Sequence, residues 1–224
     1  MLGNVFPAWT STVRDLLPIV LGGGALFVIT VVTFGFSADT IYKGYQPEQP
    51  VAYSHALHAG ELGIDCRYCH NTVDIGAKAA VPPTATCMNC HTRIWADSEE
   101  LELVREAWAN DSGIAWNRVH DLPDYAFFNH SAHVTRGVSC VECHGRVDQM
   151  EKVTQVESLS MGWCLDCHRN PVDRLRPPSE VTNLAWSADD LPEDEREALR
   201  AHFQELVDTK QINPPTTSCS GCHR

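Results

Sequence analysis

The most hydrophobic part of the chain is one run near its N-terminus. From Leu16 to Ala38, 23 consecutive residues carry no charge, and most of them are Leu, Ile, Val, Phe, Ala or Gly. A helix of that length is about 35 Å long, enough to cross a hydrocarbon core of about 30 Å. The run is longer than a typical signal-peptide core, and no cluster of Lys or Arg precedes it. It predicts a transmembrane anchor over residues 16–38, with Ser37-Ala38 as a weak alternative cleavage site.

Beyond the anchor, apolar positions recur at helical spacing. Residues 97–110 form an amphipathic pattern with acidic residues in the first turn, and Asp97 or Ser98 can serve as its N-cap. A second helix is predicted from residue 188 to about residue 210. No strand pattern of any strength is present, so the fold class is mainly α with much irregular loop. The apolar face of the second helix carries Leu199, Phe203 and Leu206.

All ten cysteines fall in five copies of Cys-x-x-Cys-His. This spacing is typical of covalent c-type haem attachment, in which both sulfurs bond one haem and the next histidine becomes the proximal ligand of its iron. The chain is therefore predicted to hold five haem c groups and to transfer electrons. The attachment cysteines are Cys66, Cys69, Cys87, Cys90, Cys140, Cys143, Cys164, Cys167, Cys219 and Cys222. The proximal ligands are His70, His91, His144, His168 and His223.

Other roles for these cysteines fit less well. A zinc site needs four ligands, usually from two Cys-x-x-Cys pairs, so five pairs leave one unmatched. Thioredoxin-like chemistry needs one such pair in a βαβ setting. Disulfides give no reason for a histidine to follow every pair.

The predicted haems must share a small volume. A compact domain made of residues 39–224 has a radius of gyration of roughly 16 Å. Five macrocycles in that space lie close enough to exchange electrons by tunnelling. They also replace much of the side-chain core, so we expect the apo-protein to be largely unfolded.

An internal repeat precedes the haem motifs. Residues 53–91 and 128–168 each contain an aromatic residue, two histidines three positions apart and two haem motifs; the fifth motif stands alone at the C-terminus. Histidines at that spacing lie on one helical face and can bind two different irons. We expect the first to serve the nearer motif and the second the farther one; a zinc-binding or surface pair is the alternative. The four predicted distal ligands are His55, His58, His130 and His133.

The fifth haem needs its own distal ligand. Met161, three residues before Cys164, is the preferred candidate, and His120 is the second. Met150 is a further candidate, as is His202, which is expected on a surface helix. If Met161 is not a ligand, it serves as soft packing against a porphyrin face. Methionine–histidine ligation would raise the potential of this haem.

The net charge and the chemistry of haem attachment predict the partners and the location of the domain. The net charge is −12, with 17 Lys and Arg against 29 Asp and Glu, which excludes nucleic acid as a natural partner and permits a basic soluble acceptor. Arg14 is the only cation before the span, so the positive-inside signal is thin. Because haem c is attached on the oxidising side of the membrane, residues 39–224 are expected in the periplasm. The anchor then lies in the inner membrane, with residues 1–15 in the cytoplasm.

With these motifs in place, the chain resembles the pentahaem subunit of alternative complex III. The resemblance is carried by residues 53–60, 66–70, 81–87 and 161–164, and it extends over nearly the whole chain. That subunit also has one N-terminal transmembrane helix and a class III-like multihaem domain. The haem motifs alone would match many class III multihaem cytochromes; the combination is more specific.

The resemblance implies that the chain is one subunit of a larger membrane complex. Alternative complex III is a membrane quinol oxidoreductase in which a polytopic subunit oxidises quinol and a large peripheral subunit holds iron–sulfur clusters. The pentahaem subunit is not an enzyme on its own. It passes electrons among these subunits and a monohaem cytochrome, and then to a periplasmic carrier or terminal oxidase.

Two other functions compete with this one. A membrane-anchored quinol dehydrogenase feeding periplasmic reductases also has one span and several haems. Its haem motif usually follows the span closely and carries a methionine two residues after the haem histidine, whereas here Cys66 lies 27 residues after Asp39 and position 72 is Thr72. A catalytic multihaem enzyme would need an iron with an open position, and the chain has histidines enough to close all five.

Overall fold

The computed structural model describes residues 6–7, 9–212 and 215–223. It divides into two compact units, Met1–Lys43 and Gly44–Arg224. Part of one sequence prediction lies outside the described residues, namely residues 1–5 and 8 of the expected cytoplasmic segment.

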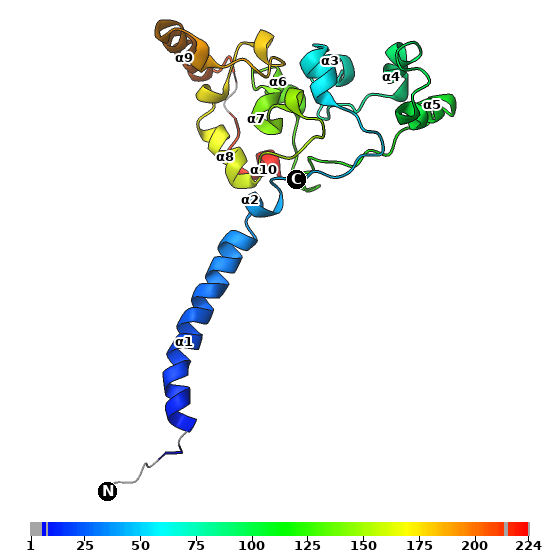
Figure 1. Ribbon diagram of the computed structural model, residues 1–224. Helices are drawn as coiled ribbons and strands as arrows, with labels where there is room; N and C mark the ends of the chain where they lie inside the picture. Colours follow the sequence, from blue (N-terminus) through cyan, green and yellow to red (C-terminus); the bar gives the residue numbers. More distant parts are fainter. Residues whose placement is uncertain (1–5, 8, 213–214, 224) are drawn as a thin grey trace. The chain divides into compact units, whose positions relative to one another are not determined.

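The first unit is one long apolar helix and a short one (Figure 1). Helix α1 spans Trp9–Thr30, a π-helical turn η1 continues it over Val31–Gly35, and α2 covers Ala38–Ile41. The 27 residues Trp9–Gly35 have a mean hydropathy of 2.3, and none of this helix is buried. It begins earlier than the predicted run because the two charges ahead of Leu16 do not interrupt the helix: Arg14 and Asp15 pair with each other at 3.0 Å. One N-terminal helix is thus long and apolar enough to span a membrane once.

The second unit holds all five motifs on short helices joined by irregular segments (Figure 1). In its described part, the only strand-like pairings are two isolated bridges, Ala126 with His223 and Val138 with Leu175. The prediction of a mainly helical, loop-rich fold is confirmed. The longer helical elements are η2 (Ala56–Glu61), α3 (Cys66–Cys69), α4 (Thr84–His91), α5 (Glu102–Ala109), α6 (His130–Val134), α7 (Cys140–His144), α8 (Met161–Arg169), α9 (Glu193–Asp208) and α10 (Cys219–Cys222). Single 3₁₀ turns are η3 (Glu99–Leu101), η4 (Val147–Gln149), η5 (Val172–Arg174), η6 (Pro178–Glu180) and η7 (Ala188–Asp190).

Both predicted amphipathic helices form, with altered starts. The first opens as the 3₁₀ turn η3, capped by the Ser98 hydroxyl on the Glu100 amide, and continues as α5. The second starts later than predicted. Residues 188–190 form the separate turn η7, and α9 begins at Glu193 directly after Pro192, whose fixed φ and missing N–H suit a helix start. Phe203 of α9 is buried as expected.

Side chains alone give this unit little core. The described residues form two small apolar clusters, one of Val51, Met88 and Val104 and one of Val73, Val134 and Val181. Among the described residues, Val181 and Ser139 are the largest side chains that are fully buried, and the Ser139 hydroxyl donates to the Val181 carbonyl at 2.6 Å. So few buried residues fit a domain whose interior is completed by another group.

One buried arginine ties the α7 segment to the chain that follows α8. The Arg176 guanidinium donates to the carbonyls of Asn183 and Trp186 at 3.1 and 3.2 Å and lies 5.0 Å above the Trp186 ring. Its backbone N–H donates to the Gly137 carbonyl at 2.9 Å. Gly137 has φ +89°, and a Cβ there would collide with the Arg176 carbonyl oxygen. Glycine is required at this position both by its conformation and by the close approach of the two backbones.

We predict that Gly137→Ala destabilises the holoprotein more than alanine at either of two other glycines. The left-handed conformation alone costs a residue with a Cβ about 1–2 kcal/mol, and the collision adds to that cost. Gly44, with φ +86° and open space, isolates the conformational cost, and Gly113 lies in open space without a left-handed φ. Thermal unfolding should rank the variants Gly137→Ala below Gly44→Ala below Gly113→Ala. Equal melting temperatures for the first two would show that the contact with Arg176 is unimportant.

Candidate haem-binding centres

Each Cys-x-x-Cys pair lies on one turn of helix. The pairs occupy α3, the second half of α4, α7, α8 and α10. Helical spacing places positions three apart on neighbouring points of one face, which brings both sulfurs of a pair to the same side. Polar caps fix several of these turns. Asp65 accepts from the Arg67 amide, Ser139 from the Val141 amide and Ser160 from the Trp163 amide.

The cysteines are not arranged for disulfides or zinc. All ten thiols are free. In the described part of the chain, no group of three or more His, Cys, Asp or Glu side chains is placed to hold a metal ion by itself. Burial raises the pKa of the Cys143 thiol to about 12, which disfavours the thiolate that zinc binds. The pairs instead have the arrangement that two bonds to one bulky group require.

Four of the histidines that follow the pairs are oriented in the same way. In each, Nδ1 lies within hydrogen-bond distance of a backbone carbonyl, and because a carbonyl can only accept, Nδ1 carries the proton. The other ring nitrogen, Nε2, then keeps its lone pair for a metal. The contacts are His70 to Ala80 at 2.7 Å, His91 to Ile94 at 2.9 Å, His168 to Thr216 at 2.7 Å and His223 to Tyr125 at 3.3 Å. Burial and neighbouring histidines lower the pKa of the remaining one, His144, to about 3, so it is neutral as well.

Three of the four histidines in the repeat make the same hydrogen bond from Nδ1 to a backbone carbonyl. Nδ1 of His58 donates to the Ser54 carbonyl at 2.8 Å, that of His130 to Ala77 at 2.9 Å and that of His133 to Asn129 at 2.8 Å. Nδ1 of His55 is buried without a hydrogen-bond partner. Burial, followed by neighbouring His70, lowers the pKa of His55 to about 4. All of these imidazoles are thus suited to bind a metal through an unprotonated nitrogen.

The structure brings these imidazoles together in the pairs that sequence order predicts. The ring centroids of His58 and His91 are 6.3 Å apart, those of His130 and His144 6.5 Å, and those of His133 and His168 6.1 Å. Two imidazoles that share one metal ion have centroids about 6 Å apart, since each nitrogen lies about 2 Å from the metal and each ring centre about 1 Å behind its nitrogen. Three separate pairs therefore fit a haem iron between them. His55 is the neighbour of His70.

One aromatic residue supports each histidine pair in the same way. Tyr53 stacks on His58 at 4.4 Å and meets His55 edge-on at 4.8 Å. In the second unit, Phe128 stacks on the later histidine of its pair at 4.6 Å and meets the earlier one edge-on at 4.8 Å. The repeat thus reproduces a three-ring arrangement, in which the aromatic ring restricts the orientation of both ligands.

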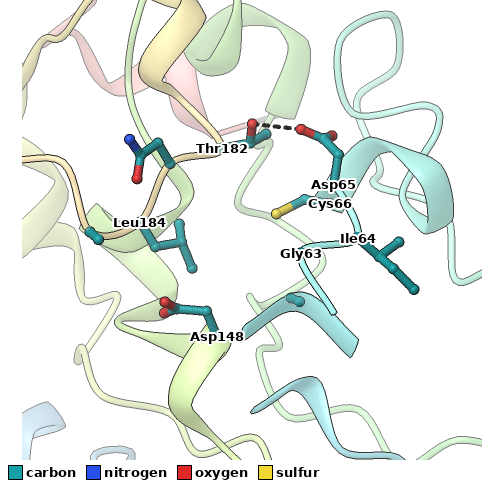
Figure 2. Close-up of a pocket in the computed structure, with 10 residues that line it drawn as sticks. Gly63, Ile64, Asp65, Cys66, Asp148, Thr182 and Leu184 are labelled. Carbon is teal, nitrogen blue, oxygen red and sulfur yellow. Dashed lines mark hydrogen bonds between the residues drawn. The ribbon is translucent and has the colours of Figure 1, made fainter. Parts of the chain in front are cut away.

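A cavity of about 290 Å³ borders the first motif (Figure 2). Cys66 and Asp148 line it from opposite sides, and Asp65 accepts a hydrogen bond from Thr182 at 2.8 Å beside it. Asp148 is ion-paired with Arg146 at 2.7 Å, and that hydrogen-bonded pair lowers its pKa. Open space next to an attachment cysteine leaves room for the edge of a group bonded to Cys66.

The candidates for a fifth distal ligand occupy different environments. Met161 is the first residue of α8 and is 66% exposed. His120 is partly buried, its Nε2 has no hydrogen-bond partner, and its ring centroid lies 4.3 Å from that of His144. Met150 ends the turn η4, and His202 lies on the exposed side of α9, as expected. None of these environments distinguishes a ligand for the iron of motif 5, so the choice stays a prediction.

Sequence reasoning missed the groups that orient the ligands. The carbonyls of Ala77, Ala80 and Thr216 carry no side-chain signal. The acceptor for His130 lies 53 positions away and that for His168 lies 48 positions away, so only the folded chain reveals them. The Asn129 cap on α6 was a detectable signal, because Asn is a favoured N-cap directly before the histidine pair.

Two comparisons with known proteins agree with this chemistry. A model of the class III cytochrome c family matches residues 35–115, which include the first histidine pair and the first two motifs. The chain is 29% identical over 209 residues to the menaquinone reductase, multiheme cytochrome c subunit, of Nitratidesulfovibrio vulgaris, and the alignment covers 91% of each chain. The chain is thus similar to multihaem cytochromes c: a region like class III cytochrome c covers its first two motifs, its described fold is mostly helical, and one apolar helix lies near the N-terminus.

We predict that the ring at position 53 is needed to orient His58. Tyr53→Ala should remove the stacking contact and convert part of one haem to a high-spin form, visible by electron paramagnetic resonance of the oxidised holoprotein. Tyr53→Phe is the matched control, because Phe128 occupies the same place in the second unit. If Tyr53→Ala stays fully low-spin, the hydrogen bond to Ser54 orients His58 without help from the aromatic ring.

Proposed function

We propose that the domain binds five haem c groups, one at each Cys-x-x-Cys-His motif, through the ten cysteines and five following histidines named above. Haems are numbered here by motif. His55, His58, His130 and His133 are the distal ligands of haems 1, 2, 3 and 4 in that order, and Met161 is the distal ligand of haem 5. When bound, haem supplies one-electron chemistry between ferric and ferrous iron. The protein side chains bind, orient and shield it.

The observation that carries this proposal is the spacing of the three histidine pairs. Their centroids are 6.1–6.5 Å apart and the pairs come from different segments of the chain. A repeated separation of this kind is not expected of unrelated surface histidines, and in every member of the three pairs except His144 a carbonyl contact shows that Nδ1 carries the proton. If each of four haem irons has two protein ligands, none of the four has an open coordination position for a substrate. This favours electron transfer over catalysis at those haems.

We further propose that the chain is an electron-transfer subunit of a membrane complex linked to quinone chemistry. The apolar helix anchors it to the inner membrane, and the haem domain over residues 39–224 lies on the periplasmic side. Partners would be a polytopic quinone-binding subunit, an iron–sulfur subunit, a monohaem cytochrome and a periplasmic electron acceptor. The resemblance to alternative complex III favours electrons arriving from quinol and leaving toward a periplasmic cytochrome or a terminal oxidase.

A second candidate runs in the opposite direction. The relative is named as a subunit of a menaquinone reductase. In a complex of that kind, a periplasmic donor would reduce the haems and the electrons would then reach a quinone. Both candidate functions use the same five haems. They differ in the redox partners of the domain and in the reduction potentials of those partners.

Purification of the native complex tests the proposal. With an affinity tag at the N-terminus, a polytopic membrane protein and an iron–sulfur protein should co-purify, and the intact mass of this chain should include five haems. A quinol analogue should reduce the haems rapidly if the complex oxidises quinol. A reduced periplasmic cytochrome should do so if the complex reduces quinone. Fewer than five haems, or no reduction by either donor, would contradict the proposal.

We predict that Met161 ligates haem 5. Methionine sulfur bound to ferric haem gives a weak near-infrared charge-transfer band, so Met161→Leu should abolish that band and lower one haem potential. Met88→Leu is the control, because Met88 packs in an apolar cluster next to a different haem motif. If the wild type lacks the band and His120→Ala makes one haem high-spin, His120 is the ligand instead.

A further inference from the structure

Haems 1 and 2 are neighbours through their own motifs and a shared ligand segment. The Asn89 side chain, within motif 2, donates to the Tyr68 hydroxyl, within motif 1, at 2.9 Å. The segment around η2 carries His58, which faces His91 of motif 2, and also carries His55, the proposed distal ligand of haem 1. The two irons are therefore bound from one short stretch of chain.

The second repeat unit contacts the first at motif 1. The loop after His70 accepts hydrogen bonds from the start of α6: the amide and Nδ1 of His130 both donate to the Ala77 carbonyl, at 3.1 and 2.9 Å. In the protein without haem, Cys66 and Cys140 lie close enough for each thiol to shift the pKa of the other. Because His130 also faces His144 of motif 3, these contacts place the predicted ligand pair of motif 3 beside motif 1.

Haem 4 follows haem 3 on the other side. The helix α6 carries both His130 and His133, and His133 faces His168 of motif 4. The chain after α8 is tied back to α7 by two arginines on Glu142, Arg174 at 3.1 Å and Arg176 at 3.4 Å. One helix and one ion-pair cluster thus join the two motifs.

Haem 5 adjoins haem 4. The Thr216 carbonyl, three residues before motif 5, accepts from Nδ1 of His168 at 2.7 Å. Figure 1 shows α4 and α5 at one end of the domain, with α3 between them and the group formed by α6, α7, α8 and α10.

The solvent exposure of the cysteines agrees with a row of motifs that has motif 2 at one end and motif 5 at the other. Of the ten cysteines, the two exposed ones are Cys90 in motif 2 and Cys219 in motif 5, while the other eight are partly covered. In the described part of the domain, the contacts of α4 with other helices are mainly with α5, which carries no haem motif.

We propose that the haems lie in the spatial order 2–1–3–4–5, and that haems 2 and 5 are the two sites where electrons enter and leave. This rests on the proposed function, since it requires all five haems. Each hop oxidises the ferrous iron of one haem and reduces the ferric iron of the next, and no atom is transferred. A redox partner in the membrane complex and a periplasmic one-electron carrier supply and remove the electron at opposite ends. The order along the chain is therefore not the order of conduction.

Redox coupling between haems tests this order in the holoprotein. His58→Met should raise the potential of haem 2, because methionine replaces histidine on its iron. Haem 2 is then reduced ahead of the others, and the loss of one positive charge on its iron lowers the midpoint potential of nearby haems, most strongly the nearest. In a titration followed by NMR with assigned haem methyl signals, haem 1 should shift most. The matched variant His133→Met alters haem 4 and should shift both haem 3 and haem 5.

A second measurement needs no variant. A soluble paramagnetic relaxation reagent added to the wild-type holoprotein should broaden the methyl signals of haems 2 and 5 most and those of haem 3 least. The order is wrong if His58→Met acts mainly on haem 3, 4 or 5, or if haem 3 is the most accessible to the reagent. Intact mass separates the two proposals: five haems with a different neighbour pattern overturn the order alone, whereas fewer than five overturn the proposed function itself.

Discussion

The interaction on which the rest of this structure depends is the hydrogen bond from a histidine Nδ1 to a backbone carbonyl. Seven of the predicted ligands make it. It settles the tautomer, restricts the ring and leaves Nε2 as the metal-binding atom. Because the acceptor is backbone, the loops that supply the carbonyls must be held in place. The irregular segments of this protein are therefore part of its ligand geometry.

The internal repeat shows how such loops are combined. Each unit has its own aromatic ring and histidine pair, and each could bind two haems by itself. The junction between them is a contact in which the first unit supplies the Ala77 carbonyl for a ligand of the second. Thus the backbone of the first unit orients a predicted ligand of the second.

The sequence predicted the elements whose signals are local. The Cys-x-x-Cys-His motif by itself indicates haem attachment. Two histidines three positions apart on a helix can reach two different irons, so residue order alone predicted which imidazoles face one another. The amphipathic residues around Val104 and Phe203 likewise indicated helices. What could not be predicted depends on distant chain segments. Examples are the Thr216 carbonyl beside His168, the Arg176 contacts to Asn183 and Trp186, and the neighbourhood of Cys66 and Cys140. Nothing in their own surroundings distinguishes these residues.

The contact between His168 and Thr216 has a consequence for biogenesis. The side chain belongs to the fourth motif, but its acceptor lies nine residues from the end of the chain. A nascent polypeptide cannot complete the environment of His168 until Thr216, 48 positions further along the chain, has been exported and has folded back against it. A product that stops before Thr216 keeps the fourth motif but lacks the carbonyl that orients its histidine.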